Sequence, residues 1–278
     1  MLLTVIATNQ MRRMLEVIFA VAVWIALGII LHLSVNAYLL LGIPLTAAFQ
    51  WGVRCQPLRA LWLRDAAPFR LGAAGRAMAA LLAAYPGYRL AKNLRVGGNA
   101  IESMWYFAAV AGAFAAAYAL RSFHRTTARD LCFCLATAGV IGIGLTALSA
   151  VALGVAHWSF EARAAEGLAS LLLYVPVVFV LEEVSFRGAF DSHVHYPGES
   201  HEYLTAFAVS ALWGLWHIPV VLGQKPLLLL IPGLLGVHCA VGVPLSISWR
   251  RSGNLFVPGL THALVDAVRN ALLIQVRL

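Results

Sequence analysis

Charged side chains are scarce in this sequence. Only 12% of its 278 residues are Asp, Glu, Lys or Arg, whereas 61% are hydrophobic. A soluble domain typically carries about 25% charged residues, so the composition excludes an ordinary soluble protein and predicts an integral membrane protein. The net charge of +8 comes from arginines, most of which fall between apolar runs. That distribution is typical of cytoplasmic loops and not of a nucleic-acid-binding face. We therefore expect the lipid bilayer as a partner and no nucleic acid.

The sequence also has few cysteines and none of the common hydrolase motifs. Its four cysteines are expected to be unpaired small residues, because most of them lie in or beside apolar runs. The first apolar run has no small-residue cleavage site, so no removable signal peptide is predicted. Gly-x-Ser-x-Gly, His-Glu-x-x-His and Ser-x-x-Lys are missing. A serine-type hydrolase and a zincin therefore lack support.

The apolar runs predict an all-α, polytopic transmembrane helix bundle of eight or nine spans. The run 14–53 is too long for one span of about 20 residues, so we expect two helices hinged near residues 34–36. The segment 71–88 leaves the number of spans open, because Pro86 and Gly87 are expected to end it. Each later run predicts one helix, and these runs are 104–120, 131–156, 168–190, 203–222, 227–248 and 255–275.

The arginines between the runs indicate the orientation of the chain. The basic loops at 121–129 and 250–251 lie an even number of spans apart, so both are expected in the cytoplasm. The loop 157–167 would then lie outside. Residues 1–156 contain no acid-rich span, and we expect them to form N-terminal transmembrane helices with basic cytoplasmic loops. The chemistry is expected in residues 157–278, as a catalytic helix bundle.

Two adjacent carboxylates interrupt the apolar run 168–190. One acid at the centre of a membrane span costs roughly 2.5–3.5 kcal/mol, so Glu182 and Glu183 indicate a function. Arg187 follows Glu183 by four residues, the spacing that brings two helical side chains together. These two residues are predicted to form a supporting ion pair within one helix. Glu182 points about 100° away from its neighbour, lacks that partner and is the candidate for chemistry.

Two further polar pairs lie inside later apolar runs. Trp213 and His217 are four residues apart, as are His262 and Asp266, so each pair lies on one face of its helix. An ionisable side chain inside a membrane must face a partner or a watered cavity. These residues are therefore candidates for one buried site shared with Glu182.

One free carboxylate, two histidines and an aspartate are the groups needed to activate water for hydrolysis. A carboxylate in a dry pocket becomes a better general base, which suits Glu182. Histidines can orient the water, bind a metal as neutral imidazoles or donate to an oxyanion. Asp266 lies one helical turn after His262 and is expected to fix the tautomer of that imidazole.

His238 and the histidines of the segment 191–202 are not expected to take part in catalysis. His238 lies in an apolar span and is interpreted as a buried core histidine. The segment 191–202 is rich in His and acidic residues, like a metal-binding tract, but a solvated loop explains it better. Within that segment, His193 and His195 are candidates to contact substrate at the mouth of the pocket.

The three motifs together resemble the CPBP family of intramembrane proteases, which includes the CAAX prenyl endopeptidases and the bacterial Abi-type proteins. The family pattern is Glu-Glu-x-x-x-Arg, then Phe-x-x-x-His, then His-x-x-x-Asn or Asp, on successive helices. The residues that match it here are Glu182, Glu183, Arg187, His217, His262 and Asp266, with Gly188, Asn254 and Pro258 also typical of the family. The similarity covers residues 168–275. Trp213 stands where the family usually has Phe, which keeps an aromatic wall but changes the shape of the substrate pocket.

The resemblance implies an intramembrane endopeptidase of the glutamate or metallo type. Glu182 would activate water with help from His217, while His262 and Asp266 would stabilise the developing oxyanion. Glu183, Arg187 and Trp213 would support these groups. Glu182, His217 and His262 offer acceptable ligand types for zinc, although no cofactor is certain and we do not expect a tightly held metal.

The expected substrate is a membrane protein or a membrane-associated peptide. Cleavage after a prenylated cysteine, trimming of a C-terminal sorting anchor and processing of a bacteriocin-like peptide all fit. The high Ala and Arg content points to a bacterial inner membrane protein. Two other classes remain open. A non-catalytic immunity or scaffold protein of the same fold would not need all four polar groups, and a transporter with a proton relay would need charged residues in both halves of the chain.

Overall fold

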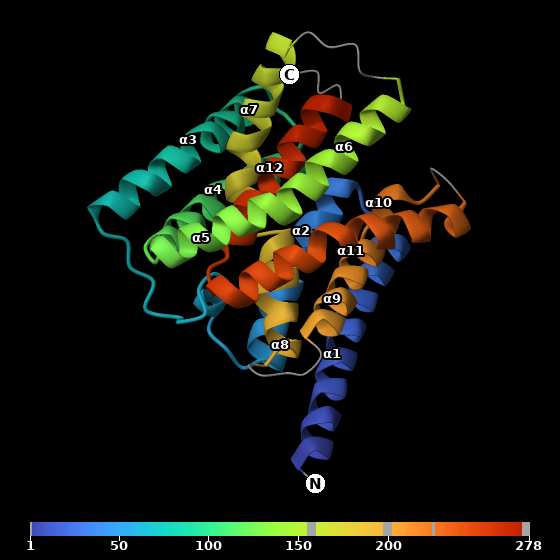
Figure 1. Ribbon diagram of the computed structural model, residues 1–278. Helices are drawn as coiled ribbons and strands as arrows, with labels where there is room; N and C mark the ends of the chain where they lie inside the picture. The colour runs from blue at the N-terminus through green and yellow to red at the C-terminus, as the bar shows by residue number, and fades with distance from the viewer. Residues whose placement is uncertain (1, 155–159, 197–201, 224–225, 274–278) are drawn as a thin grey trace.

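The computed structural model describes residues 2–154, 160–196, 202–223 and 226–273, and within these ranges it contains helices and no strand. The all-α prediction is confirmed. Figure 1 shows the helices packed into one bundle. Five helical segments of the described residues are long and apolar enough to cross a membrane: Asn9–Ile30, Ala100–Leu120, Arg125–Ala152, Glu202–Val221 and Leu227–Ser252. The chain is an integral membrane helix bundle.

The bundle consists of long helices joined by short helical segments. The longer helices are α1 (Leu2–Ile30), α2 (Val35–Ala48), α3 (Ala73–Arg95), α4 (Ala100–Leu120), α5 (Arg125–Cys134), α6 (Val140–Ala152), α7 (Phe160–Val177), α9 (Glu202–Trp216), α11 (Leu227–Ser252) and α12 (Phe256–Leu273). The shorter segments are η1 (Phe49–Val53), η2 (Leu58–Leu61), η3 (Leu135–Gly139), η4 (Val184–Asp191), α8 (Ser192–Val194) and α10 (Ile218–Val221).

The first apolar run folds as two helices with a hinge where it was predicted. α1 ends at Ile30 and α2 begins at Val35. The Ser34 side chain caps α2 by accepting a hydrogen bond from the Ala37 N–H at 3.4 Å. Serine suits this position because its side-chain oxygen satisfies a backbone donor that has no partner within the helix.

The helix predicted to end at Pro86 continues past it. α3 includes both Pro86 and Gly87 and ends at Arg95. A proline removes one hydrogen bond from a helix, and close packing of α3 along α4 offsets that loss (Figure 1). The prediction of a helix end at Pro86 is therefore wrong, because tertiary packing outweighs the local preference.

The run 168–190, predicted as one helix, is broken. α7 ends at Val177, residues 178–181 form turns, and η4 is a π-helix over Val184–Asp191. Pro176 lacks a backbone N–H and weakens the last turn of α7. π-Helical segments occur frequently at functional sites, and here the break lies directly before the two adjacent carboxylates.

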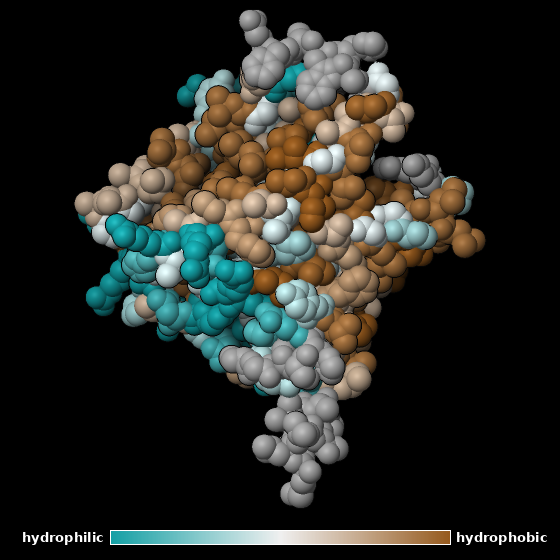
Figure 2. Space-filling model, viewed as in Figure 1, coloured by the Kyte–Doolittle hydropathy of each residue, from teal (hydrophilic) through white to brown (hydrophobic). Residues whose placement is uncertain are grey.

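Arginines from separate parts of the chain gather at one end of the bundle, which we call the basic end. Its contacts are Arg250 to Asp191 (2.7 Å), Arg251 to Asp130 (3.2 Å), Arg121 to Asp65 (3.3 Å), Arg64 to the Arg250 carbonyl oxygen (2.7 Å), Arg54 to the Gly188 carbonyl oxygen (2.8 Å) and Arg13 to the His193 carbonyl oxygen (3.5 Å). Figure 2 shows a hydrophilic patch over the start of α5 and the end of α11. The loops at 121–129 and 250–251 thus lie at one end of the bundle, as expected if both face the same side of the membrane.

The part of the chain before residue 156 shares one core with the part after it. Three hydrogen bonds of buried side chains join the two: the Tyr38 hydroxyl to the Trp216 carbonyl oxygen (2.8 Å), the Thr46 hydroxyl with the Ser185 hydroxyl (2.6 Å), and the Asn254 amide to the Ala119 carbonyl oxygen (2.9 Å). The N-terminal helices therefore help to position the region expected to carry the chemistry.

Candidate active site

Glu182 lies directly after the turns that follow α7, with 17% of its side chain exposed. Its Oε2 accepts a hydrogen bond from the Trp213 indole Nε1–H at 3.0 Å and lies 3.8 Å from Nε2 of His217. Sequence reasoning left Glu182 without a partner, because it considered only contacts within one helix. The structure adds an indole donor from α9.

His217 follows α9, and the backbone sets its tautomer. Its Nδ1 lies 2.8 Å from the Trp213 carbonyl oxygen. A carbonyl oxygen only accepts, so Nδ1 carries the hydrogen and a neutral ring presents Nε2 to Glu182 as an acceptor. The Tyr38 hydroxyl donates to the carbonyl oxygen of Trp216, the preceding residue. Tyr38, which sequence reasoning missed, therefore fixes the end of α9 from α2.

Glu183 and Arg187 form a fully buried ion pair. Their Oε1 and Nη1 atoms are 3.0 Å apart, and both side chains are 0% exposed. The same Oε1 lies 2.8 Å from Nδ1 of His262 on α12. Glu183 therefore links η4 to α12 and orients the imidazole. Sequence reasoning assigned that orienting contact to Asp266, but the shorter contact comes from Glu183.

Asp266 lies on the opposite side of His262. Its Oδ2 is 3.5 Å from Nε2 of His262, and its Oδ1 is 3.0 Å from Nη1 of Arg269. A buried carboxylate is costly unless it is paired, and Arg269 provides that pairing. Arg269 was absent from the predicted site, although its spacing of three residues from Asp266 on a helix was a usable signal.

The Trp213 indole lies at the centre of the site. The Arg187 guanidinium carbon is 4.4 Å from the ring centroid, and the His262 and His238 rings meet it edge-on at 5.1 and 4.7 Å. A phenylalanine could fill part of this space but could not donate a hydrogen bond to Glu182. The departure from the usual family residue thus adds one polar contact.

His238 is not the buried core histidine that the sequence suggested. It is half-buried and lines the same cavity as Glu182 and His217. Its Nδ1 lies 2.7 Å from the Leu234 carbonyl oxygen, and its ring centroid is 4.1 Å from that of His217. The signal that could have found it is the one used for His217, a histidine inside an apolar span.

One cavity brings these side chains together. It has a volume of about 180 Å³ and is lined by Glu182, Trp213, His217, His238, His262, Asp266 and Arg269, with apolar residues of α6 and α11. We call it the active-site cavity. All four residues proposed as catalytic from the sequence face it.

The residues that could hold a metal ion differ from the predicted set. Glu182, His262 and Asp266 each offer one ligand atom, and these atoms lie within 4.8 Å of one another. The third potential ligand beside Glu182 and His262 is therefore Asp266, where the sequence predicted His217. Carboxylate oxygen and imidazole nitrogen are zinc ligand types, and metal-binding histidines commonly donate their other N–H to a carboxylate, as His262 does to Glu183. The donor set therefore fits zinc.

The described part of the segment 191–202 is packed and is not a solvated loop. Asp191 is fully buried and paired with an arginine of α11. His193 is largely buried at the basic end, where it contacts a glutamate of α1. Neither His193 nor His195 lines the active-site cavity, so their predicted contact with substrate at its mouth is not supported. Residues 197–201 lie outside the described part of the chain.

Comparison with known families supports the resemblance inferred from the motifs. Residues 164–268 match a family model described as type II CAAX prenyl endopeptidase Rce1-like. This region includes all three motifs, and the resemblance to the CPBP family is confirmed. No curated protein and no solved structure gives a significant match.

Glu183→Gln is expected to destabilise the protein strongly, because it leaves the buried Arg187 charge without its partner. Removing one member of a buried ion pair costs about 3–5 kcal/mol. A thermal unfolding scan of the detergent-solubilised protein should show a markedly lower midpoint for this variant than for the wild type.

Glu182→Gln is the matched control, since it makes the same chemical change at the adjacent residue. The Trp213 indole can still donate to the glutamine carbonyl oxygen, and Glu182 has no arginine partner among the described residues and is 17% exposed, so the unfolding midpoint should fall far less than in Glu183→Gln. An equal loss of stability in the two variants would contradict the division of roles between these carboxylates.

Proposed function

Since residues 164–268 belong to the CAAX protease family, we propose that this intramembrane endopeptidase hydrolyses a peptide bond with a water activated by Glu182. One observation carries the proposal. Oε2 of Glu182 and Nε2 of His217 face each other at 3.8 Å in one cavity. A carboxylate and an imidazole so placed can share a water molecule.

Glu182 and His217 are both acceptors toward this water. Two acceptors that each bind one water at about 2.8 Å lie roughly 4–4.5 Å apart, so only a small adjustment separates the observed geometry from a shared water. Glu182 takes the proton as the water attacks the scissile carbonyl carbon, which is general base catalysis. The Trp213 indole keeps the carboxylate turned toward that water.

His262 is the proposed donor to the oxyanion that forms on the scissile carbonyl. The charges around it support a protonated ring. The cluster contains the carboxylates of Glu182, Glu183 and Asp266 and the guanidinium groups of Arg187 and Arg269. One imidazolium makes this cluster neutral, and a net charge in a buried site is costly. Asp266 acts through His262, because its own negative charge would repel an oxyanion.

A zinc-dependent reaction is the second candidate, supported by the donor set of Glu182, His262 and Asp266. When bound there, zinc would polarise the water and the scissile carbonyl. Its two positive charges would leave the cluster with a net positive charge, whereas a protonated His262 leaves it neutral. Charge balance therefore favours the reaction without a metal.

The substrate class follows from the membrane setting and the family. We propose a membrane-anchored protein or peptide, with a lipid-modified tail or a C-terminal anchor, in a bacterial inner membrane. An immunity or scaffold protein of the same fold has no need for four polar groups facing one cavity. A transporter with a proton relay would need charged residues in both halves of the chain, and residues 1–156 contain no acid-rich span.

Glu182→Gln is expected to abolish cleavage while the protein still accumulates, since the loss of a general base costs about 10²- to 10⁴-fold in rate. Comparative proteomics of membranes from cells with wild type and with this variant should show uncleaved precursors in the variant. Asp65→Asn removes an exposed carboxylate at the basic end and should leave processing normal. An unchanged profile in Glu182→Gln cells would refute proteolysis and favour a scaffold.

Purified protein is expected to contain far less than one zinc ion per chain and to keep its activity in a strong chelator. Elemental analysis gives a readout that does not depend on activity. Stoichiometric zinc that disappears in Asp266→Ala would contradict the charge argument and support the metal-dependent reaction.

A further inference from the structure

A cavity of about 250 Å³ lies at the basic end of the bundle. We call it the basic cavity. The side chains of Arg54 and Arg64 line it, together with that of Gln56. The described residues that line it include no carboxylate. The basic cavity therefore combines two positive charges with no negative one.

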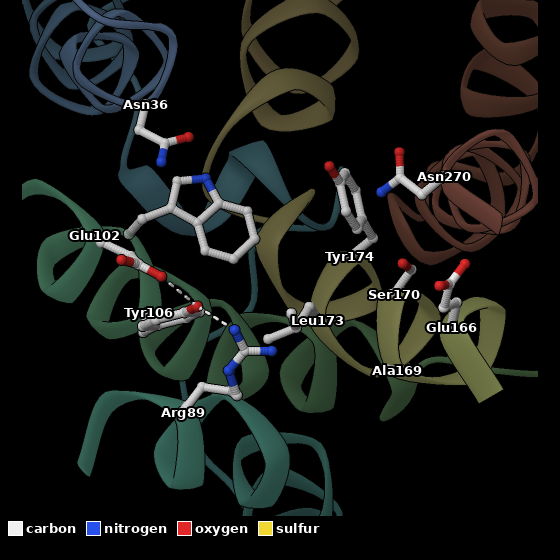
Figure 3. A pocket seen from close by; sticks show the side chains of 11 residues that line it. Asn36, Arg89, Glu102, Tyr106, Glu166, Ala169, Ser170, Leu173, Tyr174 and Asn270 are labelled. Carbon is white, nitrogen blue, oxygen red and sulfur yellow. Dashed lines mark hydrogen bonds between the residues drawn. The ribbon is translucent and has the colours of Figure 1, made fainter. Parts of the chain in front are cut away.

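Arginines that line two other cavities of the protein are accompanied by acids. In the active-site cavity, Nη1 of Arg269 lies 3.0 Å from Oδ1 of Asp266. Figure 3 shows a separate cavity of about 360 Å³, in which the Tyr106 hydroxyl donates to Glu102 and accepts a hydrogen bond from Arg89. The basic cavity differs from both, so a negative charge that balances its arginines has to come from a bound molecule.

The two arginines of the basic cavity donate to neutral acceptors. Nη1 of Arg54 donates to the Gln50 side-chain oxygen at 2.7 Å and to the Gly188 carbonyl oxygen at 2.8 Å. Nη2 of Arg64 donates to two carbonyl oxygens near the end of α11, at 2.7 and 3.1 Å. The Nε and Nη2 groups of Arg54 have no acceptor in the described part of the chain, yet they are not fully buried. A molecule in the basic cavity can therefore reach them.

The acids that contact the basic end are paired with other arginines. The pairs are Asp191 with Arg250 (2.7 Å), Asp130 with Arg251 (3.2 Å), Asp65 with Arg121 (3.3 Å) and Glu16 with Arg12 (3.5 Å). Asp191, whose charge acts on Arg64, already accepts from two nitrogen atoms of Arg250 at 2.9 and 2.7 Å. Burial and the nearby Arg13 lower the pKa of Arg54 to about 10, so its surroundings disfavour the charged guanidinium. An anion in the basic cavity would offset that penalty.

The basic cavity lies at the level of a membrane surface. Each of the five apolar segments long enough to cross a membrane has one end at the basic end. The residues whose contacts place them there are Arg13 near the start of the first segment, Arg121 after α4, Asp130 near the start of α5, Glu202 at the start of α9 and Arg250 near the end of α11. Phospholipid head groups lie at both surfaces of a bilayer, so phosphate is present at this level for either orientation of the chain.

The surface beside Arg54 is apolar. Trp51 and Val53 precede Arg54 in η1, and they are 59% and 43% exposed. Tryptophan is enriched where a protein crosses the boundary between membrane and water, and exposed apolar side chains at that level can contact acyl chains. A molecule that carries both a phosphate and an acyl chain therefore matches this surface better than a free ion does.

We propose that the basic cavity binds a phosphate group, carried by a phospholipid head group or free in solution. The guanidinium groups of Arg54 and Arg64 donate to the phosphate oxygens, a pairing that the planar fork of arginine favours. The Gln56 amide supplies a further donor. The apolar surface of Trp51 and Val53 makes a phospholipid the preferred source. Since Arg54 contacts η4 and Arg64 contacts α11, the bound phosphate links these two elements.

Thermal unfolding of the purified full-length protein in a nonionic detergent tests the site. Three probes are compared at equal ionic strength: dihexanoylphosphatidylglycerol, inorganic phosphate, and dihexanoylglycerol, which lacks the phosphate. A ligand that binds only the folded protein raises the unfolding midpoint. Dihexanoylphosphatidylglycerol should therefore raise the midpoint by several degrees, and dihexanoylglycerol should not.

The two phosphate compounds distinguish the sources. A larger rise with dihexanoylphosphatidylglycerol than with inorganic phosphate supports the site and identifies a lipid head group as its ligand. An equal or larger rise with inorganic phosphate supports the site and identifies free phosphate. If neither compound raises the midpoint, or if dihexanoylglycerol raises it as much, the proposal is overturned.

Variants show whether the rise comes from the basic cavity. Arg64→Gln removes one guanidinium and should weaken binding of the phosphate compound at least tenfold. Arg70→Gln is the matched control, because it removes the same charge from an exposed arginine of the same segment that does not line the cavity, and it should respond like the wild type. An equal loss of response in these two variants would mean a general effect of charge and would overturn the site.

Gln56→Glu keeps the test valid if Arg64→Gln folds poorly. Gln56 is exposed, and its side chain makes no hydrogen bond with the described residues, so this change places a negative charge in the basic cavity without removing a contact. The variant should fold and should lose the response to the phosphate compound. A response equal to that of the wild type would contradict binding in this cavity.

Discussion

The buried contact among Glu183, Arg187 and His262 is the interaction on which the rest of the site depends. It joins η4 to α12 through one carboxylate oxygen, with Arg187 at 3.0 Å and His262 at 2.8 Å. A buried ion pair adds little net stability but is costly to break, so this contact mainly fixes where the two elements lie. Glu182 is the adjacent residue and points about 100° away along a helical backbone. Holding Glu183 toward α12 therefore turns Glu182 toward α9.

Trp213 brings α9 into the same arrangement. Its indole donates to Glu182, carries the Arg187 guanidinium over its face and meets the edge of the His262 ring. The Trp213 side chain thus contacts Glu182, the Glu183–Arg187 ion pair through Arg187, and the His262–Asp266 pair through His262. The aromatic position of the family pattern is a hydrogen-bond donor here, and Glu182 and His217 still lie 3.8 Å apart beside the larger ring.

Sequence reasoning predicted the helical class and four of the polar residues that face the active-site cavity, because polar groups inside apolar runs are expensive and therefore informative. It missed the break before Glu182, although Pro176 was a usable signal, because residues 178–181 are as apolar as their neighbours. It also missed the contact between Glu183 and His262, because spacing along a helix says nothing about partners on another helix. The separate cavity lined by Asn36, Arg89, Glu102 and Asn270 could not be predicted for the same reason, since its walls come from α2, α3, α4, α7 and α12.

The central claim is that Glu182 and His217 act on the same water molecule. Cleavage rates of Glu182→Gln, His217→Ala and the double variant test this claim directly. Groups that work as a unit give non-additive losses, so the double variant should be about as slow as the slower single variant. If the two losses multiply, the residues act independently, and the shared water is contradicted.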